Sequence, residues 1–369
     1  MDLANEVVAR LSEIEDVELG ATLGSLGLVG EPETRSGALA VTVGFLDGPP
    51  GVREDFASRV DEAVAGLGKV SVRLEALDPE GQARVKQALM TPLMSEAATS
   101  RTPVFSLPGS RTRVIGISSG KGGVGKSSVT ANVAAELARR GSRVGLLDAD
   151  VYGFSIPRIL GVSRPPRVLD NLIVPPMAHG VRVVSLGFFV EEDTPVIWRG
   201  PMLHKTIEQF LVDVFWGELD YLLIDMPPGT GDVTLSLQQY LPKSEIYVVT
   251  TPQPSASRVA QRSALAARKL NLPVRGVIEN MSDFVTEDGK RYPIFGSGGG
   301  QEVASGLRVP LLAQIPLTMA LREGGDSGVP VVAGQPDDPA AQALSGLVDR
   351  LGDLGPTRRY RSDLRIKAN

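Results

Sequence analysis

The sequence contains no cysteine and only two histidines among its 369 residues. Without thiols the chain forms no disulfide, and it lacks the thiolates that are the usual ligands of iron–sulfur clusters. The two imidazoles do not replace them, because His204 stands beside Lys205 at an expected helix start and His179 stands beside Gly180 in an expected loop. A metal cluster held only by soft ligands of this chain is therefore not expected.

Long apolar runs and an excess of basic charge are also missing. The formal net charge is −5, which gives no general attraction to nucleic acid or to an anionic membrane. No apolar run reaches the roughly 18 residues of a membrane-spanning helix. Residues 1–6 lack the basic and apolar regions of a secretory signal. Together with the absence of disulfides, these features predict a cytoplasmic protein that has neither nucleic acid nor a membrane as a partner.

A phosphate-binding loop stands at residues 120–127, which read Gly-Lys-Gly-Gly-Val-Gly-Lys-Ser and match the pattern G-x-x-x-x-G-K-[ST]. An apolar run at 113–117 precedes it as an expected strand, and residues 127–140 follow with helical spacing. Backbone N–H groups of the loop and of the helix N-terminus can then surround phosphate oxygens. The residues predicted to bind nucleotide here are Gly120, Lys121, Gly122, Gly123, Val124, Gly125, Lys126, Ser127 and Ser128.

Acidic residues end two later apolar runs. The run at 144–147 leads into Asp148 and Asp150, and the run at 221–224 leads into Asp225. Ligands bind at the carboxyl ends of the strands in a parallel α/β sheet, so these carboxylates are expected beside the P-loop. Asp150 is the candidate that positions or activates the attacking water, and Lys126 is expected to neutralise the β- and γ-phosphates. The predicted Mg²⁺ site consists of Ser127, Asp148 and Asp225.

Strand-like and helical runs alternate between residues 113 and 355. The expected strands are 113–118, 143–148, 181–186, 220–225, 245–251, 274–280 and 310–315. This alternation predicts an α/β P-loop NTPase domain, with a mostly parallel sheet and helices on both faces. Residues 1–90 show an α-β-α-β order, which predicts a small preceding α+β domain. We expect a linker over 91–112 and a solvated basic tail over 356–369.

The loop with its second lysine, Lys121, and the segments 147–150 and 225–232 resemble the MinD/ParA class of P-loop ATPases. Segments 150–157, 198–202, 278–282 and 294–300 are similar to one branch of that class, the Mrp/ApbC family of iron–sulfur cluster carriers. The resemblance covers roughly residues 111–350. It implies an ATP- and Mg²⁺-dependent homodimer in which Lys121 reaches the phosphates bound by the other subunit. It also implies that Asn280 reads the adenine edge.

The stretch 283–293 departs from that family, whose cluster-carrying members typically have Cys-x-x-Cys between the Asn-Met-Ser and Gly-Gly-Gly motifs. An iron–sulfur cluster is therefore a doubtful cofactor, and we expect apoproteins or thiol-bearing assembly factors as partners. Segments 16–20 and 26–29 resemble the SufT/PaaD-like domain that is often fused to Mrp proteins. That domain often has a reactive cysteine before a proline, where this chain has Gly-Pro-Pro-Gly at 48–51. We expect a docking or dimer-supporting module.

These features predict a slow ATPase whose conformational cycle loads and releases cargo, with Lys121, Lys126 and Asp150 carrying the catalysis. The helical run at 201–216 is expected to be a core helix near the dimer contact. Two alternatives stay open. One is a ParA/MinD-like positioning ATPase that uses DNA or a membrane as its matrix, and the other is a nucleotide-sensing scaffold that does not hydrolyse ATP.

Overall fold

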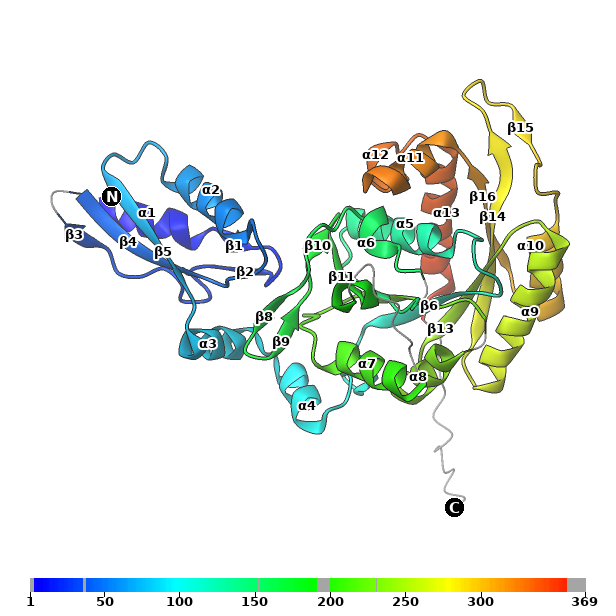
Figure 1. Cartoon of the computed structure of the whole chain (residues 1–369), viewed down its shortest axis with the longest axis horizontal. Coiled ribbons are helices and arrows are strands. Elements are labelled where there is room, and N and C mark those ends of the chain that lie inside the picture. Colours follow the sequence, from blue (N-terminus) through cyan, green and yellow to red (C-terminus); the bar gives the residue numbers. More distant parts are fainter. Residues whose placement is uncertain (1–2, 36–37, 152, 191–199, 230, 357–369) are drawn as a thin grey trace, which may run out of the picture.

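The computed structural model describes residues 3–35, 38–151, 153–190, 200–229 and 231–356. A small N-terminal domain and a larger α/β domain lie side by side, joined by helices α3 (Pro79–Leu89) and α4 (Pro92–Ser100) (Figure 1). Among the described residues, no helix is long and apolar enough to cross a membrane. The basic tail at 357–369 and the Trp198-Arg199 part of one family motif lie outside the described residues.

The N-terminal domain is built around strand β4 (Ala38–Phe45), whose alternate residues Val41, Val43 and Phe45 are buried. β4 pairs in parallel with β5 (Val70–Ala76) and antiparallel with β3 (Glu33–Arg35). Helices α1 (Leu3–Ser12) and α2 (Val52–Val64) pack their apolar faces against β4 in one hydrophobic cluster. A short ladder of β1 (Glu15–Asp16) and β2 (Ala21–Thr22) completes the unit. Helix α1, strand β4, helix α2 and strand β5 lie where the sequence predicted helices and strands, but β1, β2 and β3 lie between α1 and β4 and were not predicted.

The large domain contains a nine-stranded sheet in the order β10-β11-β7-β12-β6-β13-β14-β15, with β16 pairing to β14. Seven of its strands are parallel, and they coincide with the seven strands predicted from the sequence: β6 (Arg113–Ser119), β7 (Val144–Asp148), β11 (Val181–Ser185), β12 (Tyr221–Asp225), β13 (Glu245–Thr250), β14 (Val274–Val285) and β16 (Leu311–Leu317). Two short antiparallel strands, β10 (Met177–Ala178) and β15 (Arg291–Tyr292), were not predicted. The predicted α/β fold is confirmed.

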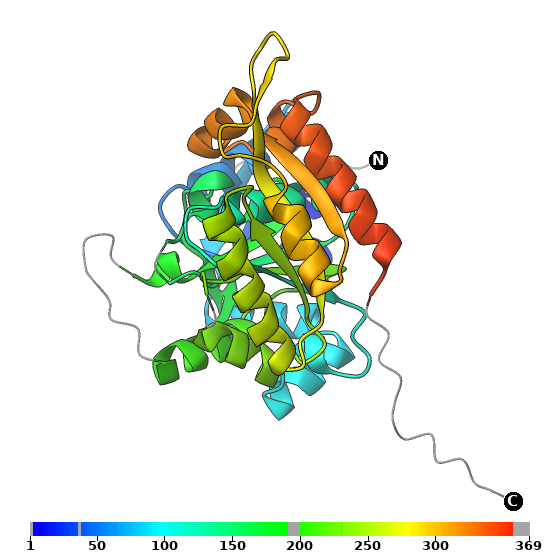
Figure 2. The ribbon, with the colours of Figure 1, turned by 90° about the vertical axis from the view of Figure 1, so that its right-hand side faces the viewer.

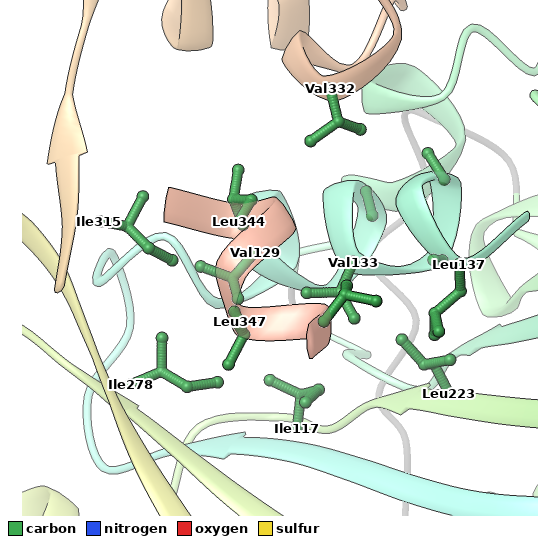
Figure 3. Close-up of a cluster of buried hydrophobic side chains, with 14 of the residues drawn as sticks. Ile117, Val129, Val133, Leu137, Leu223, Ile278, Ile315, Val332, Leu344 and Leu347 are labelled. Carbon is green, nitrogen blue, oxygen red and sulfur yellow. The ribbon is translucent and has the colours of Figure 1, made fainter. Parts of the chain in front are cut away.

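Helices cover both faces of this sheet. One face is covered by α5 (Lys126–Arg139), α6 (Ile156–Ile159), α11 (Met319–Ser327), α12 (Val331–Gly334) and α13 (Pro339–Leu354). In Figure 3, Val129, Val133 and Leu137 of α5 point into the cluster that this face forms with the sheet. The other face is covered by α7 (Gly200–Val212), α8 (Asp232–Tyr240), α9 (Pro254–Lys269) and α10 (Gly299–Leu307). The central strands are thus buried on both sides, which explains their continuous apolar runs.

The two domains share one hydrophobic cluster and a buried ion pair. Leu169 of β8 (Arg167–Leu169), Val174 of β9 (Leu172–Val174) and Phe215 join the core of the N-terminal domain. Arg167 donates to both carboxylate oxygens of Asp16, at 2.7 and 3.1 Å. Burial alone would raise the pKa of Asp16, but the hydrogen bonds and charge of Arg167 hold that pKa below its usual value. The small domain is therefore packed onto the α/β domain.

The segment expected to be a linker, 91–112, is more ordered than its composition predicts. Thr91 caps α4 by accepting a hydrogen bond from the Met94 backbone N–H, and Pro92 occupies the first turn. Phe105 and Leu107, further along, are buried in the structure. Thr91-Pro92 therefore begins a helix, although the same residue types are also typical of a linker.

Candidate nucleotide-binding site

The P-loop leads from the end of β6 at Ser119 into α5, which begins at Lys126. Strand, loop and helix follow one another as the sequence predicted. Glycine is required at the first position, because a Cβ on Gly120 would lie 2.2 Å from the backbone nitrogen of Ala260 in α9. The loop backbone is therefore held directly against α9, and the glycine permits this close approach.

Lys126 lies at the centre of a buried cluster of charges. Its Nζ is 2.7 Å from Oδ2 of Asp225 and 3.3 Å from Oδ2 of Asp150. Ser127 donates its hydroxyl to the same Asp225 oxygen at 2.5 Å. The ammonium thus balances two carboxylates away from water, where such interactions are strongest. An incoming phosphate must compete with these carboxylates for the same ammonium.

Asp148 lies beneath this cluster and is fully buried. It stands opposite Asp225 in the register of β7 and β12. Its oxygens accept hydrogen bonds from the Asp150 backbone N–H at 3.2 Å and from the Ser185 hydroxyl at 3.0 Å. Burial, followed by the negative charge of Asp225, raises the pKa of Asp148 to about 8. The three predicted carboxylates therefore meet at the carboxyl edge of the sheet, where Asp148 and Asp225 are fully buried and Asp150 is slightly exposed.

Two hydroxyl residues take part in the site although sequence reasoning did not select them. Thr130 donates to Oδ1 of Asp225 at 2.8 Å, whereas Ser127 donates to Oδ2, so each oxygen of that carboxylate has a hydroxyl partner. Ser185 orients Asp148, as described above. Thr130 could have been found, since it stands one helical turn after Lys126 on the same helix. Ser185 could not, because its role depends on the register between β11 and β7.

A cavity of about 400 Å³ opens above these groups. It is lined by the P-loop from Lys121 to Ser128, and by Asp150, Ser155 and Pro228. Lys121 is exposed at its rim, unlike the buried Lys126. The cavity therefore combines backbone amides of a helix N-terminus, a buried cation and carboxylates, which suits a polyphosphate with an associated divalent cation.

Asn280, near the middle of β14, contacts the P-loop. Its side-chain Nδ2 donates to the backbone carbonyl of Val124 at 2.9 Å, and the residue is buried. That Asn280 reads the adenine edge stays a prediction.

The two histidines, which were not expected to bind a metal, contact a hydroxyl and a backbone carbonyl. His204 Nδ1 lies 2.8 Å from the hydroxyl of Ser236, and His179 Nε2 lies 3.0 Å from the carbonyl of Gly328.

The hairpin formed by the end of β14 and by β15 projects beyond the rest of the domain (Figure 2). This is the stretch without the family's cysteines. Its charged residues pair locally, with Lys290 at 2.7 Å from Asp288 and Arg291 at 3.4 Å from Asp283. Across the described residues, no group of three or more histidines, cysteines or acidic residues has an arrangement that could hold a metal ion.

The fold and this site together define a P-loop NTPase. Residues 110–352 match the family model described as ParA, NUBPL iron-transfer P-loop NTPase, and the chain belongs to this family. The chain is 42% identical over 360 residues to an iron–sulfur cluster carrier protein of Mycobacterium leprae, covering 95% of this chain and 93% of that one. It is 39% identical over 355 residues to a protein of the same name from Synechocystis, covering 94% and 96%. The predicted resemblance is confirmed.

Solved structures agree on the fold. A nucleotide-binding protein from Archaeoglobus fulgidus, in complex with ADP and with cobalt, superposes with a TM-score of 0.53 at 33% identity and covers 65% of this chain and 92% of that one. The cell division ATPase MinD from Pyrococcus furiosus gives a TM-score of 0.50 at 26% identity, covering 66% and 99%. The aligned part is about the size of the α/β domain.

Proposed function

We propose that this chain is an ATP-binding and ATP-hydrolysing carrier that takes part in iron–sulfur cluster assembly or transfer through an ATP-dependent homodimer cycle. The observation that carries the proposal is the cluster in which Ser127, Asp150 and Asp225 surround the buried ammonium of Lys126 beneath the P-loop cavity. The relatives named iron–sulfur cluster carrier proteins support the carrier role.

Two lysines would act on the phosphates, and Asp150 would act on the attacking water. Lys126 would exchange its carboxylate partners for phosphate oxygens when ATP enters, and Lys121 would extend from the exposed rim to the phosphates bound by a second subunit. Because Lys126 is only 3.3 Å from Asp150, its transfer to phosphate would release that carboxylate to orient water. Water then attacks the γ-phosphorus, the bond to the bridging oxygen breaks, and ADP and phosphate leave. Positioning and charge stabilisation account for most of such catalysis.

Mg²⁺ fits the oxygen donors that the chain provides. The Ser127 hydroxyl and the Asp225 carboxylate lie 2.5 Å apart, and both are hard ligands of the kind that Mg²⁺ prefers. Asp148 would support this site from below through its place opposite Asp225. When bound, the cation would neutralise developing charge on the β- and γ-phosphates.

The cargo would be held with thiols from outside this chain, because the sequence contains no cysteine. Apoproteins or thiol-bearing assembly factors are the partners that this chemistry requires. The N-terminal domain would serve as a docking module held against the ATPase domain, where a Cβ on Gly48 of its Gly-Pro-Pro-Gly loop would lie 2.7 Å from the Arg167 side chain.

The decisive test measures phosphate release and molecular mass in the same samples. The unaltered protein with ATP and Mg²⁺ is expected to release phosphate slowly and to sediment as a dimer, while the protein with ADP sediments as a monomer. The dimer is expected with ATP because Lys121 would complete a site only by reaching the phosphates bound by a second subunit. Absence of hydrolysis together with intact ATP binding would favour the nucleotide-sensing scaffold. ATP-dependent sedimentation with liposomes or plasmid DNA would favour the positioning ATPase.

A further inference from the structure

One wall of the P-loop cavity belongs to the chain that follows β7. Residues 153–167, called here the wall segment, contribute Gly153, Ser155 and Ile159 to the lining of the cavity, where Asp150 also lies. The Gly153 backbone N–H donates to the Asp150 carbonyl at 3.3 Å, so the start of the segment is attached to the residue proposed to orient water. The position of Asp150 in the cavity therefore depends on how the wall segment is held.

Helix α6 of the wall segment is packed closely at two places. Ile156 and Leu160 are buried in the hydrophobic cluster that also contains the apolar face of α5. Gly161 meets Gly328 at the end of α11, where a Cβ on Gly161 would lie 2.7 Å from the Gly328 carbonyl oxygen. Both glycines have positive φ angles, of 66° and 77°. A helix packed this closely transmits a displacement to its neighbours, because protein interiors have low compressibility.

The far end of the wall segment is bound to the N-terminal domain. Arg167 is 6% exposed and donates to both carboxylate oxygens of Asp16 and to the carboxylate of Glu18. Three residues earlier, Arg164 lies 2.6 Å from a carboxylate oxygen of Asp55 in α2. Of these contacts, those of Arg167 are buried, and they are therefore the stronger attachment.

The link between the two arginines is stiff. Pro165 and Pro166 stand between Arg164 and Arg167, and each proline ring holds its φ at about −65°. Strand β8, which begins at Arg167, lies between the N-terminal domain and the α/β domain (Figure 1). The wall segment thus connects the P-loop cavity to the N-terminal domain through a packed helix and two prolines.

A second contact between the domains does not involve the wall segment. Arg182 of β11 donates to the backbone carbonyl of Glu18, and its guanidinium lies 5.5 Å from the centre of the Phe215 ring. Arg182 comes from a strand of the central sheet that pairs with β7. The chain therefore offers two arginines that hold the same part of the N-terminal domain, and only Arg167 is attached to the cavity wall.

We propose that Arg167 is a positioning residue for ATP hydrolysis: by binding the wall segment to the N-terminal domain, it sets the position of Asp150 in the P-loop cavity. This inference rests on the proposed function, in which Asp150 orients the attacking water. The phosphates are bound by the P-loop itself, so the contact acts on the rate of hydrolysis and leaves ATP affinity unchanged.

The first test compares the full chain with Arg167→Ala. Calorimetry measures the ATP dissociation constant and counts the ATP-binding sites, and single-turnover phosphate release is expressed per site. Release is expected to slow about tenfold, because a small displacement of a catalytic group is costly, while the dissociation constant stays unchanged. A merely structural role lowers the number of sites and leaves the rate at each site as it was. Unchanged release per site, or a tenfold loss of ATP affinity, would overturn the proposal.

A double variant tests whether Arg167 acts through Asp150. Asp150→Ala alone is expected to slow release on the order of 10². Adding Arg167→Ala to it should slow release no further, because the group that Arg167 positions is already gone. A further tenfold loss in the double variant would show that Arg167 acts by another route, and the proposal would be wrong.

The matched control is Arg182→Ala, which removes an arginine that contacts the same Glu18 but leaves the wall segment attached. Its release per site and its ATP dissociation constant are expected to equal those of the unaltered chain. A tenfold loss of release in this control would show that any loosening between the domains slows hydrolysis, and would contradict a specific role for Arg167.

Arg167→Ala leaves Asp16 buried without its cation, which is destabilising. If this variant does not fold, hydrogen exchange of the unaltered chain decides. The backbone N–H groups of Glu18 and Leu19 donate to Asp16 at 3.2 and 3.1 Å. ATP with Mg²⁺ draws Lys126 away from Asp150, so exchange at these two groups is expected to change about twofold or more, while β5 stays unchanged.

Unchanged exchange at Glu18 and Leu19 would overturn the proposal while leaving the proposed function intact. Failure of the unaltered chain to release phosphate would instead refute the proposed function, and this inference with it.

Discussion

The P-loop cavity and the projecting hairpin both adjoin β14, yet they differ in what they offer a ligand. The cavity has a buried ammonium, hydroxyls and carboxylates within 2.5 to 3.3 Å of one another. The hairpin has Asp283, Asp288, Lys290 and Arg291, which pair among themselves at its surface. One region is prepared for phosphate, and the other has no soft ligand. Membership of an iron-transfer family therefore does not supply the ligands for iron, which depend on particular side chains.

The largest effect is expected when the cavity loses its buried charge. Lys126→Ala should weaken ATP binding on the order of 10³-fold, because the ammonium makes charge-assisted bonds to the phosphates. Lys121→Ala is the matched control, since it removes the same charge from the exposed rim. It should leave ATP binding largely intact while blocking ATP-driven dimerisation and hydrolysis. Calorimetry and sedimentation measure the two properties, and an equal loss of ATP affinity in both variants would refute the two-subunit arrangement.

A smaller effect is expected from Asp150→Ala. ATP and Mg²⁺ should stay bound, and hydrolysis should slow by a factor on the order of 10², because the variant loses water positioning and no phosphate contact. Single-turnover phosphate release with saturating ATP separates the chemical step from binding. Turnover equal to that of the unaltered protein would move the role to Asp225 or to Asp232, the aspartate that ends the family segment 225–232.

The hairpin should bind iron when two cysteines are introduced into it. Thr286 and Gly289 end its turn, with the Gly289 N–H donating to the Thr286 carbonyl at 2.8 Å, and they have the Cys-x-x-Cys spacing. The variant Thr286→Cys/Gly289→Cys is expected to take up about four irons per two chains on anaerobic reconstitution, since two subunits would together supply four thiolates.

The control for this gain is Thr286→Ser/Gly289→Ala, which makes changes at the same sites without thiols. A cysteine at residue 289 must adopt a φ of 79°, which costs on the order of 1 kcal/mol at an exposed turn. Equal iron uptake by both variants would show that the added thiols do not hold the iron. The missing cysteines would then not explain the difference between the hairpin and the cavity. No uptake by the cysteine variant would show that its geometry does not suit a cluster.

Sequence reasoning succeeded where the signal is local. The seven parallel strands are continuous apolar runs, and the P-loop is fixed by spacing within eight residues. The three aspartates could be placed together because the carboxyl ends of parallel strands share one edge. Lys126, Asp150 and Asp225 indeed lie in contact.

It failed where the signal is not local. β15 is exposed on both residues and offers no periodicity, so the hairpin could not be distinguished from a loop. The contact of Asn280 with Val124 joins residues 156 positions apart. The helix after Thr91 was missed for a different reason, because a threonine before a proline is typical of both a linker and a helix start.

The most direct test of the central claim, that the chain keeps the nucleotide chemistry but supplies no cluster ligands, is anaerobic reconstitution of the unaltered protein with ATP and Mg²⁺. Iron and sulfide are measured after desalting, with and without a thiol-bearing partner. The account predicts ATP turnover but no retained cluster from the protein alone. Recovery of about four irons and four sulfides per two chains, stable without added thiol, would contradict it.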